Sequence, residues 1–389
     1  MIRNHYPRLS YSRTDVRLAG RKLAQPVIYS PETHREAVEA FAVAHAWRAS
    51  HFYPMRSVRG TMAAYMRLGG VHGDMASRVK RMPSIRRKLA DTDLDVSLDK
   101  MQDLGGCRAI LDDIDGVNTL VDIVRERIPH GVRREWPYIE RPKPDGYRSH
   151  HFSLEFDPRR KQDEQYAGRL IELQIRTRLQ HSWATSIEAV SLYRGEDLKH
   201  HRGDASWLRL FLLAAAEFAE VERCPLPSGV PERPERIREL RDLNSRLNAD
   251  SMLENIKAAT FWAETNFNGG GTHYLLRYRP NHTVKIETHF NIMSAMAALA
   301  AAERPTDEGE NRENVVLVEV DKIDKLVDMY PNYFGDVSLF VSNLRRACSG
   351  RPGVEYTVAA PEVVQAIRQQ IGDPRTLRRH YSRWVERTR

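Results

Sequence analysis

The sequence predicts a mixed α/β (α+β) fold, with a second and smaller α+β domain in the C-terminal half. Three observations lead to this prediction. Over residues 71–195, short apolar runs at strand spacing alternate with apolar residues at helical spacing. A proline-rich stretch at 224–236 interrupts this pattern. From about residue 255 strand and helix patterns begin again.

We therefore divide the chain into four predicted parts. They are an N-terminal helical segment (1–70), a central α/β domain (71–223), a linker with a charged helix (224–254), and a C-terminal α+β regulatory domain with a basic tail (255–389). In the first part, Ser30 is typical of a helix cap, Pro31 of a first helical position, and Glu32 of the positive helix end.

The central domain is expected to alternate strands and helices. Its predicted strands are 107–111, 152–156 and 171–175; its predicted helices are 117–128, 179–190 and a buried helix at 206–222. Beyond the linker, we expect helices near 237–247, 291–303, 321–329, 336–347 and 361–371, and strands near 273–279, 283–290 and 314–320.

Composition narrows the class of protein. The net charge of +8 favours an anionic partner such as a nucleotide or RNA. The N-terminus has no apolar core typical of a signal peptide, and no apolar run is long enough to span a bilayer. The three cysteines are scattered, without metal-site spacing. These features predict a soluble cytoplasmic protein with reduced thiols and no membrane partner.

The strand at 171–177 carries a polar face. Side chains alternate across a strand, so Glu172, Gln174 and Arg176 share one face, opposite the apolar residues. A carboxylate, an amide and a guanidinium in line suit a polar cleft. A solvated outer face with an ion pair is the alternative.

The segment 77–89, SRVKRMPSIRRKL, holds six cations and no carboxylate. Neighbouring like charges repel by about 4 kcal/mol at ~4 Å and an effective dielectric near 20, unless water or an anion separates them. A triphosphate would be such an anion. An exposed basic helix face is the alternative.

A possible metal ligand precedes the strand at 107–111. Asp103 lies before the Gly105-Gly106 turn, and Arg108 lies on the strand itself. Mg2+ prefers one or two carboxylates together with phosphate oxygens. Asp103 and Glu172 would supply that pair if their strands are neighbours. A turn aspartate with a local hydrogen bond is the alternative.

The segment 141–151, RPKPDGYRSHH, joins a proline-glycine turn to cations, an aromatic ring and two histidines. The ring of Tyr147 offers a face on which a base can stack. Lys143, Arg148 and His151 offer hydrogen-bond donors for phosphate. The alternatives are a half-buried packing ring and an ordinary surface pair of histidines.

Four segments in this order, SRVKRMPSIRRKL, DLGGCR, KPDGYRSHH and IELQIRTRLQHSWA, resemble the synthetase domain of the RelA/SpoT family over roughly residues 45–220. The resemblance implies a nucleotidyltransferase-like mixed sheet flanked by helices. It also implies transfer of pyrophosphate from ATP to the 3′-hydroxyl of GDP or GTP, with Mg2+ as cofactor, the activity of a GTP pyrophosphokinase in the stringent response.

The resemblance also implies a role for each matching residue. The catalytic residues and the Mg2+ ligands that it implies are Asp103 and Glu172. The ATP contacts it implies are Arg78, Lys80, Lys88 and Arg108. The acceptor contacts it implies are Lys143, Tyr147, Arg148, His151, Gln174 and Arg176.

Two departures suggest a small alarmone synthetase with an added domain. About 70 residues precede the site and the dipeptide His-Asp is absent, so we expect no hydrolase domain. Some relatives are toxins restrained by a C-terminal domain until a protein trigger acts, and Tyr330 and Tyr333 resemble the tyrosine pair of such antitoxin-like domains. Aromatic packing in a turn is the alternative.

Other functions stay open at this point. Toxic relatives pyrophosphorylate the 3′-end of tRNA, and the tail at 374–389 places six arginines among aromatic rings. A non-catalytic nucleotide- or RNA-binding module is the remaining hypothesis. The sequence does not indicate the oligomeric state.

Overall fold

The structure is a computed structural model. It describes residues 6–7, 9–25, 31–91, 93–194, 198, 203–259, 261–265, 273–278, 283–303, 314–319 and 337–355. Residues 1–355 form one compact unit by their contacts.

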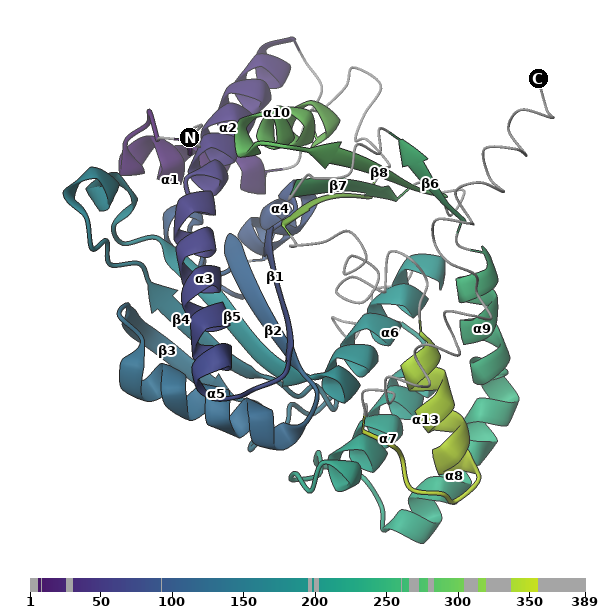
Figure 1. The fold of residues 1–389 in the computed structure, drawn as a ribbon. Helices are drawn as coiled ribbons and strands as arrows, with labels where there is room; N and C mark the ends of the chain where they lie inside the picture. Colours follow the sequence, from purple (N-terminus) through teal and green to yellow (C-terminus); the bar gives the residue numbers. More distant parts are fainter. Residues whose placement is uncertain are drawn as a thin grey trace, which may run out of the picture. The chain divides into compact units, whose positions relative to one another are not determined.

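The described strands form one mixed sheet in the order β3-β4-β5-β2-β1-β9-β7-β8-β6 (Figure 1). Their bounds are β1 Gly73–Val79, β2 Gly105–Leu111, β3 Gly131–Pro137, β4 His150–Glu155, β5 Leu170–Thr177, β6 Phe261–Thr265, β7 His273–Tyr278, β8 Thr283–His289 and β9 Asn314–Glu319. The neighbours β2 and β5 are parallel, as are β6 and β8, and the other pairs are antiparallel. The predicted mixed α/β fold is confirmed.

Among the described helices, α5, α6, α7, α8, α10 and α13 lie where helices were predicted, whereas α4 and α9 were not predicted. The bounds of the described helices are α1 Arg13–Ala24, α2 Pro31–Ala49, α3 Phe52–Leu68, α4 Met82–Ala90, α5 Ile114–Arg127, α6 Arg178–Arg194, α7 Ala205–Val221, α8 Arg233–Leu247, α9 Ala249–Ala259, α10 Ile292–Glu303 and α13 Ser338–Cys348. Short 3-10 helices occupy Leu98–Lys100 and Lys161–Tyr166. The helix predicted to begin at Pro31 does so.

One face of the sheet is apolar and forms the main core. Leu173 and Ile175 of β5 pack there with Met55 of α3 and Val121 of α5, all buried. Because burying each such side chain is worth roughly 1.5–3 kcal/mol, this face fixes which residues of each strand point the other way. The same core includes Leu275 of β7 and further residues of α10 and β9.

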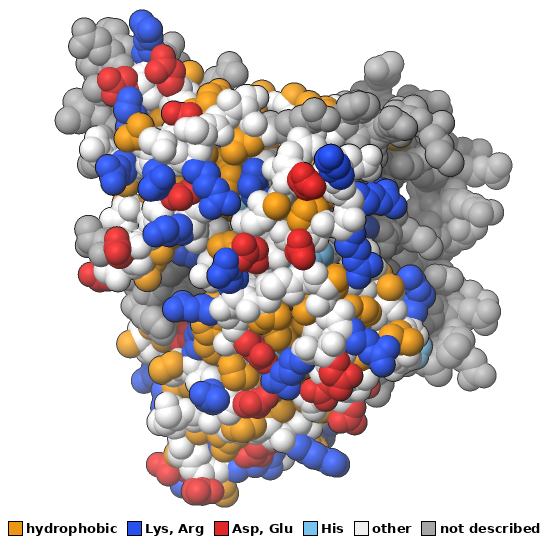
Figure 2. Space-filling view, turned by 90° about the vertical axis from the view of Figure 1, so that its left-hand side faces the viewer, with side chains coloured by type: hydrophobic (Ala, Val, Ile, Leu, Met, Phe, Trp, Pro, Cys, Tyr) orange, Lys and Arg blue, Asp and Glu red, His pale blue; other side chains and the backbone are white. Residues whose placement is uncertain are grey.

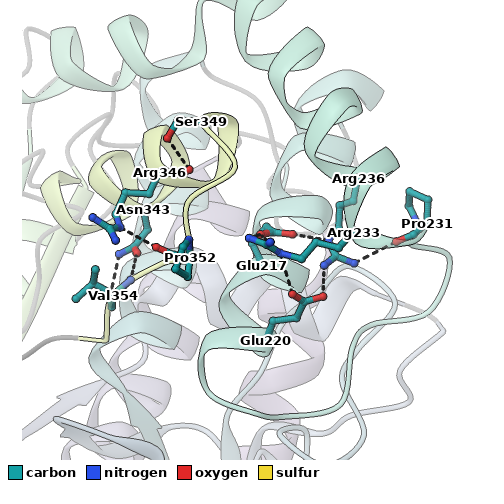
Figure 3. Close-up of polar contacts among 10 residues, drawn as sticks. All are labelled: Glu217, Glu220, Pro231, Arg233, Arg236, Asn343, Arg346, Ser349, Pro352 and Val354. Carbon is teal, nitrogen blue, oxygen red and sulfur yellow. Dashed lines mark hydrogen bonds and ion pairs between the residues drawn. The ribbon is translucent and has the colours of Figure 1, made fainter.

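A second apolar cluster is built from helices. It joins α6, α7, α8, α9 and α13, and α7 is buried nearly all round, as predicted. Close contacts include the rings of Phe211 and Phe340, whose centroids lie 5.2 Å apart. On another side of α7, Glu217 accepts a hydrogen bond from Arg236 at 2.7 Å and ties α7 to α8 (Figure 3).

The sheet continues across the predicted boundary near residue 255. Strand β9 pairs with β1 through Ser77–Glu319 and Arg78–Val318. The described strands β7, β8 and β9 therefore belong to the same sheet as the central strands, and the division of the chain at 224 and 255 stays a proposal. The helices predicted at 321–329 and 361–371, Tyr330, Tyr333 and the basic tail lie outside the described residues.

Among the described residues, no helix is both long enough and apolar enough to cross a bilayer. The face in Figure 2 carries interspersed Lys or Arg and Asp or Glu side chains, with hydrophobic side chains between them.

Candidate active site

The second face of the central sheet is polar. Register places Arg108 beside Gln174, and Gln174 beside His151, across β2, β5 and β4. Arg78 of β1 lies opposite Gly106, which lies opposite Glu172. The residues that share this face are Arg78, Arg108, His151, Glu172, Gln174 and Arg176. The structure thus brings together predicted site residues from four strands.

Asp103 lies at the mouth of this face and contacts two lysines. Its Oδ2 atom is 2.8 Å from Lys80 Nζ and 3.1 Å from Lys88 Nζ. Its Oδ1 atom is buried and has no hydrogen-bond partner in the described part of the chain. A buried carboxylate oxygen without a partner is costly, so this oxygen is suited to a ligand.

The basic segment 77–89 does not form one exposed helix face. Arg78 belongs to β1, Lys80 follows that strand, and Lys88 belongs to α4. Lys80 and Lys88 converge on Asp103, whereas Arg87 is exposed. Strand and helix together therefore bring separate cations to one carboxylate.

Glu172 is held as a carboxylate. His151 Nδ1 lies 3.2 Å from Glu172 Oε1, and Gln174 Nε2 donates to Oε2 at 2.9 Å. Burial raises the pKa of Glu172. The hydrogen bond and charge of His151, together with Lys80 and Gln174, lower it by more, so that the pKa is about 2. Lys80 therefore acts electrostatically on both acidic residues.

The two acidic residues fit a magnesium ion that shares its coordination with phosphates. The strands β2 and β5 are direct neighbours, and Asp103 precedes the start of β2. The described residues contain no group of three or more His, Cys, Asp or Glu that could hold a metal by themselves. Mg2+ takes one or two carboxylates when phosphate oxygens and water complete its shell, and the partnerless Asp103 Oδ1 fits such a role.

The loop before β4 carries Tyr147 beside cations. Gly146 has φ +91°, a conformation that favours glycine. Lys143 Nζ lies 5.2 Å from the ring centroid of Tyr147 and 4.6 Å from that of Tyr138. The Tyr147 hydroxyl lies 2.9 Å from His151 Nε2. Burial raises the pKa of Tyr147. The charges of His151 and Arg176 lower it by more, so that the pKa is about 8.

The two histidines that begin β4 face opposite sides of the sheet. His151 lies on the polar face, between Tyr147 and Glu172. His150 lies on the other face, where its Nε2 is 2.8 Å from Glu135 Oε1. Only His151 therefore belongs to the site, because neighbouring strand residues alternate in direction.

Arg176 is buried under helix α6, with partners that the sequence analysis missed. Its Nη2 lies 2.5 Å from His181 Nδ1, and Glu188 acts on its charge. Burial, followed by the charge of Arg108, lowers the pKa of Arg176 to about 9. His181 and Glu188 are seven residues apart on α6, so helical spacing could have placed them on one face.

Arg148 is not brought to the polar face. It was expected to contact the acceptor, but its guanidinium is buried, and Nη1 lies 2.5 Å from Glu222 Oε2 beyond the end of α7. The physical reason is again alternation, because Tyr147 and His151 point to one side of the extended chain and Arg148 to the other.

Comparison with known proteins identifies this region. Residues 77–197 match the family described as a region found in RelA / SpoT proteins. The chain contains a RelA/SpoT domain. Asp103, Glu172 and the 141–151 loop all lie within the matched residues.

Two curated relatives illustrate the match to the RelA/SpoT domain. GTP pyrophosphokinase YwaC of Bacillus subtilis is 30% identical over 113 residues, which cover 28% of this chain and 53% of the relative. A GTP pyrophosphokinase of Escherichia coli K12 is 25% identical over 182 residues, 45% of this chain and 23% of the relative. The chain thus spans about half of the first relative and about a quarter of the second.

Solved structures also align with the RelA/SpoT domain protein. A GTP pyrophosphokinase family protein from Streptococcus pneumoniae aligns with TM-score 0.38 and 21% identity over 52% of this chain and 95% of that chain. The small alarmone synthetase 1 of Bacillus subtilis bound to its product pppGpp aligns with TM-score 0.31 and 18% identity, over 53% of this chain and 91% of that chain.

Proposed function

We propose that this RelA/SpoT domain is an ATP-dependent pyrophosphokinase that acts on the 3′-hydroxyl of GDP or GTP. One observation carries the proposal: Asp103 has a buried oxygen without a partner, beside two lysines and next to the strand that carries Glu172. Cations and a metal-binding carboxylate at one place suit a triphosphate donor. Relatives named GTP pyrophosphokinase support the same reaction.

In the proposed reaction the acceptor 3′-oxygen bonds to the β-phosphorus of ATP. The bond from that phosphorus to the oxygen of the α-phosphate breaks, AMP leaves, and the hydroxyl proton is released. Asp103 and Glu172 would hold Mg2+, which when bound neutralises phosphate charge. Lys80, Lys88, Arg78 and Arg108 would hold the donor phosphates. Tyr147 would stack on the acceptor base, with Lys143 and His151 beside it.

The ionisation of Glu172 favours one of its two expected roles. A carboxylate with a pKa of about 2 accepts a proton poorly at neutral pH. It remains charged, however, and can bind a metal ion or orient a hydroxyl. We therefore assign Glu172 to positioning and metal binding rather than to general base catalysis.

The test is direct. The purified full chain is incubated with ATP, Mg2+ and GDP or GTP, and the products are separated by anion exchange. We expect a 3′-pyrophosphorylated guanine nucleotide and an equal amount of AMP. If neither forms across a range of Mg2+ concentrations, the nucleotide reaction is excluded. If Asp103→Asn and Glu172→Gln leave the cellular effect of the chain unchanged, a non-catalytic binding module is favoured.

A second candidate acceptor is the 3′-end of tRNA, and one observation favours it. Further aromatic rings lie near Tyr147. The ring centroids of Tyr138 and Tyr147 are 6.2 Å apart. Close by in the chain, Arg134 Cζ lies 5.9 Å from the ring centroid of Trp136. Rings and cations in a row are typical of single-strand binding. Labelled phosphate from ATP that appears on tRNA, and not on free nucleotide, would select this acceptor.

We also propose that residues 255–389 restrain the segment 77–89, which carries proposed ATP contacts, until a protein trigger acts. Glu303 of α10 accepts a hydrogen bond from the Met82 backbone at 2.9 Å and pairs with Arg48, and β9 pairs with Arg78. Deletion of residues 255–389 would also remove Leu275 and Leu317 from the main core, so it tests folding as well. Alanine at Tyr330 and Tyr333 is the cleaner test, and raised activity or toxicity is expected; unchanged activity would contradict restraint by this pair.

A further inference from the structure

A buried polar network lies behind the acceptor loop, at the end of α7. Glu222 Oε2 accepts hydrogen bonds from Arg148 Nη1 at 2.5 Å and from Gln180 Nε2 at 3.0 Å. Glu222 Oε1 accepts a hydrogen bond from the Thr177 hydroxyl. All four side chains are at most 3% exposed. One carboxylate thus binds three segments: the loop before β4, the end of β5 and the start of α6.

These three segments carry the site. Arg148 directly follows Tyr147, whose hydroxyl contacts His151, the partner of Glu172. Thr177 directly follows Arg176, and Gln180 directly precedes His181. Arg176 and His181 are in contact with each other. A shift of Glu222 would therefore move the acceptor ring and the Arg176–His181 pair together.

The same helix also supports the loop by close packing. A side chain added at Gly146 would lie 2.6 Å from Ala215 Cβ, so the backbone lies directly against α7. Tyr147 packs against the helical cluster that contains Trp183. This packing sets how closely the loop approaches α7. The Arg148–Glu222 ion pair adds a directional contact that fixes where the loop lies along the helix.

We propose that Glu222 is a positioning residue for the acceptor: through Arg148 and Thr177 it fixes the loop that carries Tyr147 and the end of β5. The inference rests on the proposed function for its effect on the reaction. Arg148 then acts by holding Tyr147 in place, and not by touching acceptor phosphates.

Helix α7 offers a matched control. Glu217 is also buried, at 3% exposure, and accepts hydrogen bonds from Arg236 at 2.7 Å and Arg233 at 3.2 Å (Figure 3). Both of these partners belong to α8, and neither belongs to the three segments that Glu222 joins. Glu217→Gln and Glu222→Gln each remove one buried carboxylate charge, the first within α7 and the second at the residue directly after it.

The first measurement does not depend on the reaction. Hydrogen exchange of the ligand-free full chain is followed by mass spectrometry for Glu222→Gln and Glu217→Gln. We expect faster exchange over residues 143–151 in the first variant alone. Equal exchange of this segment in both variants, or no change in either, would overturn the inference whether or not the chain is a pyrophosphokinase.

The second measurement uses kinetics. Glu222→Gln is expected to raise KM for the guanine nucleotide on the order of tenfold, because small misplacements of binding groups are costly, and to leave KM for ATP near its wild-type value. Glu217→Gln should lower Tm and leave both KM values unchanged. If Glu222→Gln raises both KM values equally, the specific role is refuted.

A double variant separates positioning from folding. Arg148→Met with Glu222→Gln leaves no unpaired buried charge, so Tm should recover relative to Glu222→Gln. The acceptor KM should stay high, because the loop has lost its anchor. Recovery of both Tm and acceptor KM would mean that the network serves stability alone. A wild-type chain without activity would refute the proposed function, and the exchange data would then decide the anchoring.

Discussion

Lys80 Nζ lies 2.8 Å from Asp103 Oδ2, and the charge of the same lysine lowers the pKa of Glu172. One cation therefore acts on both carboxylates assigned to the metal, although 69 residues separate Asp103 from Glu172 in the chain. The lysine helps to keep Glu172 of β5 ionised, while its ion pair with Asp103 lies just before the neighbouring strand β2.

Asp103→Asn is expected to reduce kcat/KM by about 100- to 1,000-fold, the loss typical when one preorganised electrostatic group of a reaction site is removed. The change keeps the size of the side chain but removes the charge that gathers Lys80 and Lys88. Steady-state formation of AMP measures it.

Asp112→Asn is the matched control for this change. Asp112 follows β2 at its opposite end and pairs with Arg178 at 2.7 Å. We expect this variant to lower Tm and to keep most of the activity. Equal losses in Asp103→Asn and Asp112→Asn would show that the sheet needs its carboxylates for folding and not for the reaction.

Glu172 should make the protein acid-sensitive over a defined range. Its pKa in the folded chain is about 2, below the ordinary 4.5, so the unfolded chain binds the proton at higher pH. The stabilisation is therefore complete above the ordinary pKa and is lost as pH falls between about 5 and 2. In urea titrations, Glu172→Gln should show a smaller loss of unfolding free energy over this range than the wild type.

His151→Gln should share that effect, because His151 is the main group that lowers the pKa of Glu172. The double variant should then add little, as expected for two residues in contact. Additive losses would show that acid sensitivity arises elsewhere in the chain.

Gly146→Ala is expected to destabilise the fold and to weaken acceptor binding. Its φ of +91° disfavours a side chain, and the new Cβ would lie 2.6 Å from Ala215 Cβ. Gly229→Ala is the control, because its φ is +75° but nothing lies within 4 Å of the added carbon. The left-handed conformation alone should cost Gly229→Ala roughly 1 kcal/mol of unfolding free energy. Thermal unfolding of Gly146→Ala should show a larger loss, and equal losses would contradict the close packing on α7.

Alternation explains both what the sequence predicted and what it missed. It placed Glu172, Gln174 and Arg176 on one face, since Leu173 and Ile175 mark the core side. The same rule, applied from Tyr147 onwards, would have separated Arg148 from Tyr147 and His150 from His151. The nine-residue match to a family motif instead grouped Arg148 with Tyr147 and His151.

Two features had no signal in the sequence. Strand β3, Gly131–Pro137, is a largely exposed edge strand and lacks the apolar alternation by which strands are recognised. The pairing of β9 with β1 depends on backbone hydrogen bonds at the edge of the central strands, and these leave no residue code. Sequence reasoning therefore identified β2, β4, β5, β7, β8 and β9 as strands, but could not show that one sheet includes both halves of the chain.

Trp136→Ala distinguishes the two candidate acceptors. In the register of β3 with β4, Trp136 lies opposite His151 and therefore on the polar face, farther towards the sheet edge than Tyr147. A single guanine nucleotide needs one stacking ring, whereas an RNA 3′-end offers further bases, each worth about 1–3 kcal/mol when stacked. If RNA is the acceptor, the variant should have a KM for tRNA that is roughly 5- to 150-fold higher. Its KM for ATP should stay unchanged. Tyr147→Ala should impair either acceptor and serves as the positive control. An unchanged KM for tRNA in Trp136→Ala, combined with normal transfer to GTP, would restrict the acceptor to the mononucleotide, because the second ring would then contribute nothing to binding.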